Sequence, residues 1–183
     1  EYADRLLEFK KRVLYIINIS QDLEFLEATH MHKGVLHQSA VTKTDYGVAW
    51  VNRQGCYFYD GKQVTDLIEK GPRRVIKTSD WNSFTTDNST IGYIPAERQL
   101  LVLKDCTATS DGDIFIYDMV TQSWSKGNSK ITDSVKNTNF QTDWNGDLVW
   151  ASEITSDTIT VKKWSNDGQA SADFLYTTKD IDF

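Results

Sequence analysis

The sequence predicts an all-β fold made of about four blade-like units of antiparallel strands. Three observations carry this prediction. The chain contains short apolar runs rich in Val, Ile, Tyr, Phe and Trp, and it shows little helical periodicity. Asp-Gly and Asn-Gly dipeptides separate many of these runs, and strand pairs recur at intervals of roughly 40–50 residues. That interval is typical of a β-propeller blade, and a β-sandwich is the alternative architecture.

Each expected unit opens with a pair of strands. The first pair, residues 5–9 and 12–19, is the weakest copy and turns at Lys10-Lys11. The later opening pairs are residues 46–51 with 56–60, 91–95 with 100–105, and 140–144 with 147–151. The last two units continue with a second pair each, at residues 112–118 with 122–125 and at residues 158–164 with 172–176.

The connections support this order of strands. Four-residue connections are expected at residues 52–55 and 96–99. Four dipeptides supply the positive φ that tight hairpins need, namely Asp60-Gly61, Asp111-Gly112, Asn145-Gly146 and Asp167-Gly168.

The whole chain is expected to be one all-β, propeller-type segment of a longer polypeptide, spanning residues 1–183. Its approximate units are residues 1–44, 45–88, 89–138 and 139–183. Propeller blades bury both faces against their neighbours, which fits runs that are apolar on successive residues. Six tryptophans fit the wide outer gaps between twisted sheets.

Seven residues are expected to hold the blades together. Tyr117-Asp118 followed by Trp124 resembles the outer hairpin of kelch-type blades, although the Gly-Gly pair of true kelch repeats is missing. In that hairpin the Asp accepts hydrogen bonds from the turn, and the Trp packs between neighbouring blades. The expected set is Trp50, Tyr59, Asp60, Tyr117, Asp118, Trp124 and Trp150.

The composition excludes several classes of protein. The chain carries 20 basic and 26 acidic residues, a net charge of −6, so it lacks the basic footprint of a nucleic-acid-binding protein. No apolar run approaches the length of a membrane span, and no signal-peptide pattern opens the sequence. Cys56 and Cys106 are too few for a disulfide framework and are expected to be buried free thiols, which suits a reducing compartment.

The candidates for metal binding are weak. His30 and His32 stand two residues apart, as two ligands on one strand face would, with His37 nearby. Only Glu24 or Glu27 is near enough in sequence to complete a set, so these histidines are expected in loops. The acidic turns at residues 111–113 and 143–147 lack the closing Glu of a calcium loop and are interpreted as hairpin turns.

Catalysis is not expected. Several sialidases and glycosidases are propellers that use paired carboxylates, but residues 165–168 lack the spacing and the Trp of their Asp-box turn, Ser-x-Asp-x-Gly-x-x-Trp. The six arginines show no arrangement typical of a sialate-binding triad, and they are Arg5, Arg12, Arg53, Arg73, Arg74 and Arg98. No catalytic residue, metal ligand or cofactor-binding motif is therefore assigned, and the chain is predicted not to be an enzyme.

Soft strand-and-turn motifs over most of the chain resemble one family. The motifs are DRLLEFKKR at 4–12, YIINIS at 15–20, EFLE at 24–27, YGVAWVN at 46–52, GCYFYDG at 55–61, IGYIP at 91–95, IYD at 116–118 with SW at 123–124, and YTTKDIDF at 176–183. Together they are similar to the propeller region of tail tube or nozzle proteins of short-tailed bacteriophages. None of these motifs is a chemical signature.

The resemblance implies a structural protein of the virion tail, made in the cytoplasm of the bacterial host. It implies a homo-oligomer, commonly a sixfold ring, with the portal, adaptor and fibre proteins as partners and with the DNA exit channel inside. No membrane contact and no sequence-specific nucleic-acid contact is implied, and an acidic balance fits a channel that does not grip the duplex. A kelch-like protein-binding module is the first alternative, and a glycan-processing propeller enzyme is the second.

Overall fold

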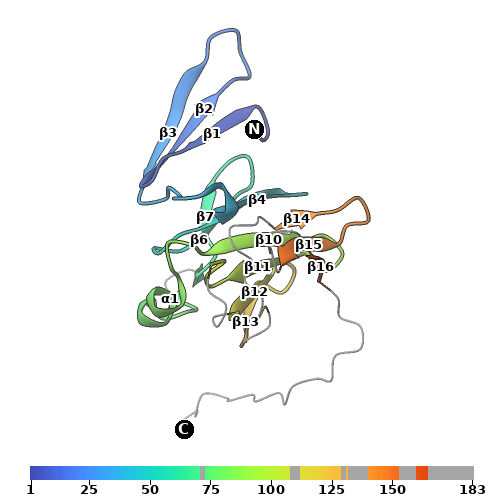
Figure 1. Cartoon of the computed structure of the whole chain (residues 1–183). Coiled ribbons are helices and arrows are strands. Elements are labelled where there is room, and N and C mark those ends of the chain that lie inside the picture. The colour runs from blue at the N-terminus through green and yellow to red at the C-terminus, as the bar shows by residue number, and fades with distance from the viewer. Residues whose placement is uncertain (71–72, 108–111, 129–130, 132–139, 153–159, 165–183) are drawn as a thin grey trace.

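The protein is all-β, as the sequence predicts (Figure 1). The computed structural model describes residues 1–70, 73–107, 112–128, 131, 140–152 and 160–164. Four small antiparallel sheets hold most of the strands. The first sheet contains β1 (Arg5–Phe9), β2 (Val13–Asn18) and β3 (Phe25–Met31), and the second contains β4 (Val41–Thr44), β5 (Gly47–Val51), β6 (Cys56–Tyr59) and β7 (Val64–Asp66).

Two more sheets and a few short elements complete the fold. The third sheet contains β10 (Thr90–Ile94), β11 (Gln99–Leu103), β12 (Ile114–Asp118) and β13 (Ser123–Gly127). The fourth contains β14 (Gln141–Thr142), β15 (Leu148–Ser152) and β16 (Thr160–Lys163). The short elements are the 3-10 turn η1 (Gln38–Ala40), the two-stranded pair β8 (Glu69–Lys70) with β9 (Arg73–Arg74), and the helix α1 (Thr78–Phe84).

Every sheet is a meander whose strands lie in chain order. The expected turns produce this topology. Gly61 and Gly146 both adopt positive φ, at 96° and 85°, in the hairpins between β6 and β7 and between β14 and β15. The expected connection at residues 52–55 joins β5 to β6, and the connection before Gln99 joins β10 to β11.

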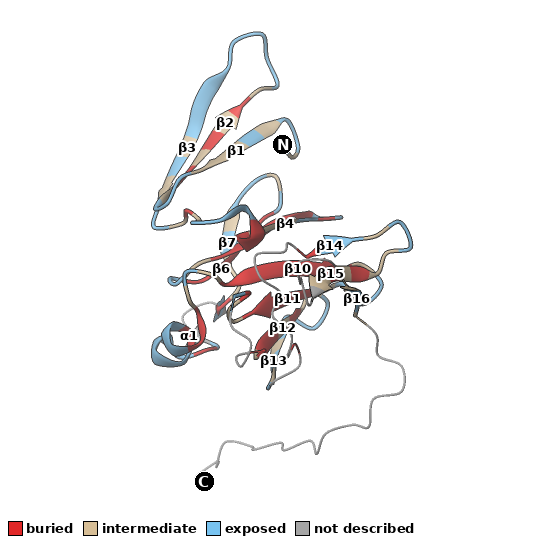
Figure 2. Cartoon of the chain, viewed as in Figure 1, coloured by how far each residue is buried: buried red, intermediate tan, exposed pale blue. Residues whose placement is uncertain are grey.

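The second and third sheets are buried on both faces, because the sheets stack in series. Side chains alternate between the faces of a strand. In β5, Val48 and Trp50 pack in a cluster with the first sheet, whereas Ala49 and Val51 pack in a cluster with the third. In β11, alternate residues likewise pack toward the second sheet (Leu100, Val102) and the fourth (Leu101, Leu103). Figure 2 shows this burial along β11.

The first strands of three sheets lie side by side. β10 contacts β4 and η1 on one side and β14 and β15 on the other. Among the described residues, no strand of one sheet pairs with a strand of another, and the sheets form an open series rather than a closed ring. β4 lies before the unit boundary placed at residue 44, yet it pairs with β5 of the second sheet.

Several elements differ from the prediction. The expected strand at 140–144 ends at Thr142, because the Asp143 carboxylate accepts the N–H groups of Asn145 and Asp147 and starts the turn there. Trp144 consequently lies at the tip of the hairpin and is 92% exposed. β3 and α1 were not expected, and neither were the short elements β4, β7, β8, β9 and η1. The expected strand at 172–176 and the turn at 167–168 lie outside the described residues.

Candidate interaction site

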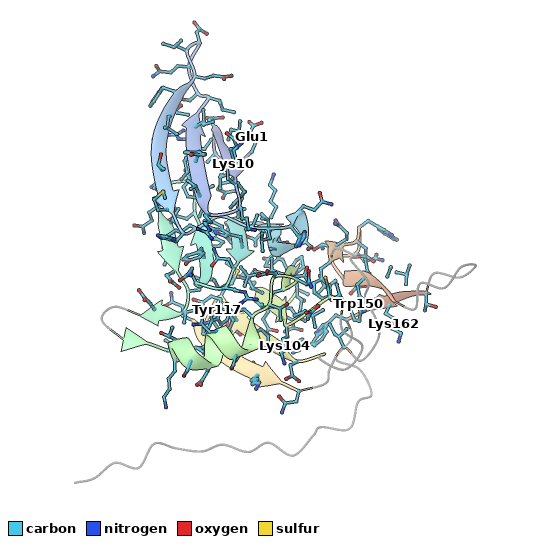
Figure 3. All side chains as sticks on the ribbon, turned by 60° about the vertical axis from the view of Figure 1, so that its left-hand side comes forward. Glu1, Lys10, Lys104, Tyr117, Trp150 and Lys162 are labelled. Atoms are coloured by element: carbon cyan, nitrogen blue, oxygen red, sulfur yellow. The ribbon has the colours of Figure 1, made fainter. Side chains whose placement is uncertain are left out.

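Two of the tryptophans expected between blades are buried between sheets. Trp50 packs its ring 5.3 Å from Phe9 of the first sheet and 5.6 Å from Tyr57. Trp150 of the fourth sheet lies 5.8 Å from Phe140 and packs in one cluster with the third sheet. Figure 3 shows Trp150 toward this end of the stack and Tyr117 nearer its centre.

Trp124 also lies between sheets, as the kelch-like pattern predicts. Its Nε1 donates a hydrogen bond of 3.0 Å to the Leu67 carbonyl, which follows the second sheet. Its ring lies 4.9 Å from Tyr117 and 5.9 Å from Trp81 of α1. Tyr117 packs in this same cluster, while Tyr59 packs between the first and second sheets. Desolvation raises the pKa of both phenols.

Asp60 and Asp118 organise their own hairpins rather than the contacts between sheets. The Asp118 carboxylate accepts the N–H groups of Val120 and Thr121, both at 2.8 Å. Asp60 accepts the N–H groups two and three residues onward in the same way. These bonds hold the pKa of each carboxyl below its usual value. The two hairpins are therefore built alike, each after a Tyr-Asp pair.

We expect Asp118→Ala to lower the melting temperature, because two backbone N–H groups lose their acceptor. Asp118→Asn keeps an acceptor oxygen and should lower it less. The folded-state pKa of Asp118 is depressed chiefly by the Thr121 N–H. Its contribution is therefore present above the unfolded-state pKa of about 3.9 and is lost as the pH falls through the folded-state value. Thermal denaturation of both variants from neutral to acidic pH measures this, and an unchanged melting temperature would remove the kelch-like interpretation of the hairpin.

The first sheet has an outer face that carries two apolar rows. Strand register puts Leu6, Ile17 and Leu26 in one row and Val13 and Met31 in another. These rows lie opposite the face that packs on the second sheet, since their neighbours Leu14 and Ile16 belong to the buried cluster. Leu6, Leu26 and Met31 are 43%, 56% and 59% exposed. Figure 2 shows the exposure of β3. We call this surface the outer face.

A cleft of about 580 Å³ opens where several connections of the first three sheets meet. We call it the connection cleft. Its lining residues come from the β1–β2 turn, from the segment between β3 and β4, from the β5–β6 turn, and from the residues before β10. They are Lys11, Arg12, His32, Gly34, Leu36, Ala40, Val51, Asn52, Arg53, Gln54, Thr86, Asp87 and Ser89.

Asn52 organises the walls of the connection cleft. Its amide nitrogen donates to the carbonyls of His32 and Gly34 at 3.0 and 2.8 Å. Its amide oxygen accepts the N–H groups of Gln54 and Gly55. Asn52 therefore fixes the β5–β6 turn against the segment that leaves β3.

The connection cleft is positively charged. Lys11, Arg12 and Arg53 line it together with a single carboxylate, Asp87, which pairs with Arg53 at 2.8 Å. Both partners of this pair are exposed, so the pair itself adds little stability. The cleft thus has a charge opposite in sign to that of the whole chain.

The weak metal candidates do not come together. His30 lies on β3, and desolvation followed by the charge of Lys33 lowers its pKa. His32 follows β3, with φ at 63°, and His37 precedes η1. Among the residues described, no three His, Cys, Asp or Glu side chains lie close enough to hold a metal ion. Cys56 and Cys106 are buried and form no disulfide, as expected, and desolvation raises the pKa of the Cys56 thiol.

Sequence reasoning did not identify the connection cleft. Asn52 and Arg53 were recognised only as parts of a turn, and Lys11 and Arg12 only as a short basic block. The block Lys10-Lys11-Arg12, the longest in the chain, was the one available signal. Its meeting with residues 32–34 depends on tertiary structure, which one sequence does not reveal.

Comparisons with known proteins do not assign this chain to a family. No model of a known protein family matches the sequence, and no curated protein matches it. Within the part of the chain that the structure describes, no helix has the length and apolar character needed to cross a membrane.

Proposed function

We propose that this chain is a structural component of a tailed-bacteriophage virion, in the tail tube or nozzle, and that its stacked sheets form part of a propeller. The observation that carries the proposal is the burial of the second and third sheets on both faces. Face-to-face stacking of meander sheets is the packing of propeller blades. Such a body resists deformation, because each sheet braces the next.

The outer face of the first sheet supports an assembling role. Two apolar rows flank a central row of Glu8, Tyr15 and Thr29 on this face, and nothing in the described residues covers it. We propose that a sheet from a second copy of the chain packs there, continuing the same face-to-face stacking around a ring. Sixfold symmetry, contacts with portal, adaptor and fibre proteins, and passage of DNA without sequence-specific contact belong to this proposal. It requires no catalytic residue, metal or cofactor.

The test is the mass and shape of the protein in solution. Native mass spectrometry and negative-stain microscopy are expected to show rings, and Leu26→Arg is expected to dissociate them by placing a charge on the outer face. Val120→Arg is the matched control, because Val120 is 65% exposed, against 56% for Leu26, but lies in the β12–β13 turn. A monomer at all concentrations, or rings that Leu26→Arg leaves intact, would overturn the assembly.

A kelch-like binding module is the second candidate. The cross-sheet hydrogen bond from Trp124 to Leu67 favours it, since the Trp of a kelch-type hairpin packs between blades. This candidate predicts a monomer with a single toroidal domain in the same micrographs. The two functions are therefore separated by one measurement.

A further inference from the structure

We propose that the connection cleft binds a phosphate group carried by a small organic ligand or by a polymer end. The proposal concerns residues 11–12, 32–36, 51–54 and 86–89, and it does not depend on the phage-tail assignment. Four lines of argument support it: a fixed framework, an excess of positive charge, an apolar floor, and a volume that suits a phosphate with its attached group.

The framework of the cleft is set by bonds between distant parts of the chain. The Val35 N–H donates to the Lys10 carbonyl at 3.0 Å, which ties the segment after β3 to the basic β1–β2 turn. Asn52 ties that same segment to the β5–β6 turn. Trp81 Nε1 donates to the Asn52 carbonyl at 3.0 Å from the buried side. The cations therefore project from backbone that is already held in place, which lowers the entropy lost on binding.

The charge of the cleft favours a doubly charged anion. Three permanent cations face a single carboxylate, and that carboxylate is already bonded to Arg53. The described residues provide no ion-pair partner for Lys11 or Arg12, which are both exposed. A net excess of about two positive charges matches a phosphate monoester near neutral pH, whose second pKa is about 6.

The arginines and the floor add selectivity. A guanidinium offers two parallel N–H donors that match two phosphate oxygens, so Arg12 can bind in a bidentate manner. Val51 and Ala40 are buried and form an apolar part of the lining, with Leu36 beside them. Apolar walls lower the local dielectric constant and strengthen attraction to the cations.

The size of the cleft indicates more than a bare ion. A volume of about 580 Å³ lies within the range of sites for small organic ligands, roughly 300–1,000 Å³. His32 lines the same space and offers its imidazole as a hydrogen-bonding group beside the anion. The ligand is thus a phosphate with an attached polar group, such as the phosphorylated end of a sugar or glycerol chain.

The test is isothermal titration of the intact protein with glycerol 3-phosphate, a polymer of glycerol phosphate, inorganic phosphate and glycerol alone. We expect saturable one-to-one binding of the monoester that weakens with added salt, and no binding of glycerol. Tighter binding of the polymer would identify a polymer end as the source, whereas tighter binding of the monoester would identify a small molecule.

Two variants test whether the monoester binds in the connection cleft. Arg12→Ala is expected to weaken monoester binding at least about tenfold, since a hydrogen bond to a charged group contributes about 1.5 kcal/mol or more. Lys62→Ala, in the exposed β6–β7 turn, is the control and should bind as the unaltered protein does. Absence of saturable monoester binding, or equal binding by the Arg12 and Lys62 variants, would overturn the proposal. A thermal melt of each variant confirms that the fold is retained.

Discussion

Trp81→Ala is expected to lower the free energy of unfolding by about 3–5 kcal/mol, the range for removing a large aromatic side chain from a core. Trp81 is fully buried. Its ring lies about 6 Å from the rings of Phe84, Phe115 and Trp124. The substitution leaves a cavity where α1 meets the second and third sheets, and the Asn52 carbonyl loses its donor.

Two controls separate packing from the hydrogen bond in this experiment. Trp81→Phe keeps a ring but loses Nε1, so it should cost less than the alanine variant. Trp144→Ala removes a tryptophan that is almost fully exposed and should leave stability unchanged. Urea denaturation followed by far-UV circular dichroism gives all three values. Equal stability of Trp81→Ala and Trp144→Ala would contradict the burial of Trp81.

Gly34→Ala is expected to produce the second large effect, a destabilisation of about 1–3 kcal/mol from overpacking. A Cβ on Gly34 would overlap the Lys10 carbonyl oxygen and lie 2.5 Å from the backbone nitrogen of Val13. Backbone cannot move aside as a flexible side chain can. The segment after β3 must therefore separate from the β1–β2 turn, which breaks the Val35–Lys10 hydrogen bond.

Amide hydrogen exchange measures which strands the Gly34→Ala substitution destabilises. Amides of β1, β2 and the segment after β3 should exchange faster in Gly34→Ala, whereas those of β11 and β12 should be little changed. Gln21→Ala, in the exposed β2–β3 turn of the same sheet, is the matched control and should leave exchange as it is. Uniform acceleration over all four sheets would show that the first sheet does not open as a separate unit.

The strands that the sequence predicts best are those buried on both faces. β6, β10, β11 and β12 contain successive apolar residues, and a turn dipeptide or an expected four-residue connection lies at an end of each, so the strand and one of its boundaries can be predicted. β3 was not predicted because Phe25–Met31 has neither a continuous apolar run nor a strict alternation, since Glu27, Thr29 and His30 interrupt it. Its pairing with β2 cannot be predicted from the local sequence.

The helix α1 was missed for a different reason. It has seven residues, and Thr, Ser, Asp and Asn make up most of them, so neither length nor helix propensity indicates a helix. What stabilises it is the packing of Trp81 and Phe84, three residues apart, against Phe115. That contact spans more than thirty positions in the sequence, so local pattern cannot reveal it.

The residues of the inter-sheet contacts were more predictable than the connection cleft. Trp50, Trp124 and Trp150 are large side chains inside strands, so their burial between sheets is expected from size and strand position together, whereas Trp144 lies in a turn and is exposed. The connection cleft instead combines side chains from four connections. The sequence of a connection can predict its turn type, but it does not show which other connections lie beside it in the fold. Charge at Lys11 and Arg12 was visible, but its proximity to Arg53 was not.

The meander order of every sheet has a consequence for biosynthesis. Each strand pairs only with its immediate neighbours in sequence, so a sheet can form as soon as its own residues have left the ribosome, without waiting for distant partners. A newly formed sheet would then expose the apolar face that the next one covers. We therefore expect the chain to fold vectorially, from the N-terminus onward, with each sheet packing on the face of the sheet that formed before it.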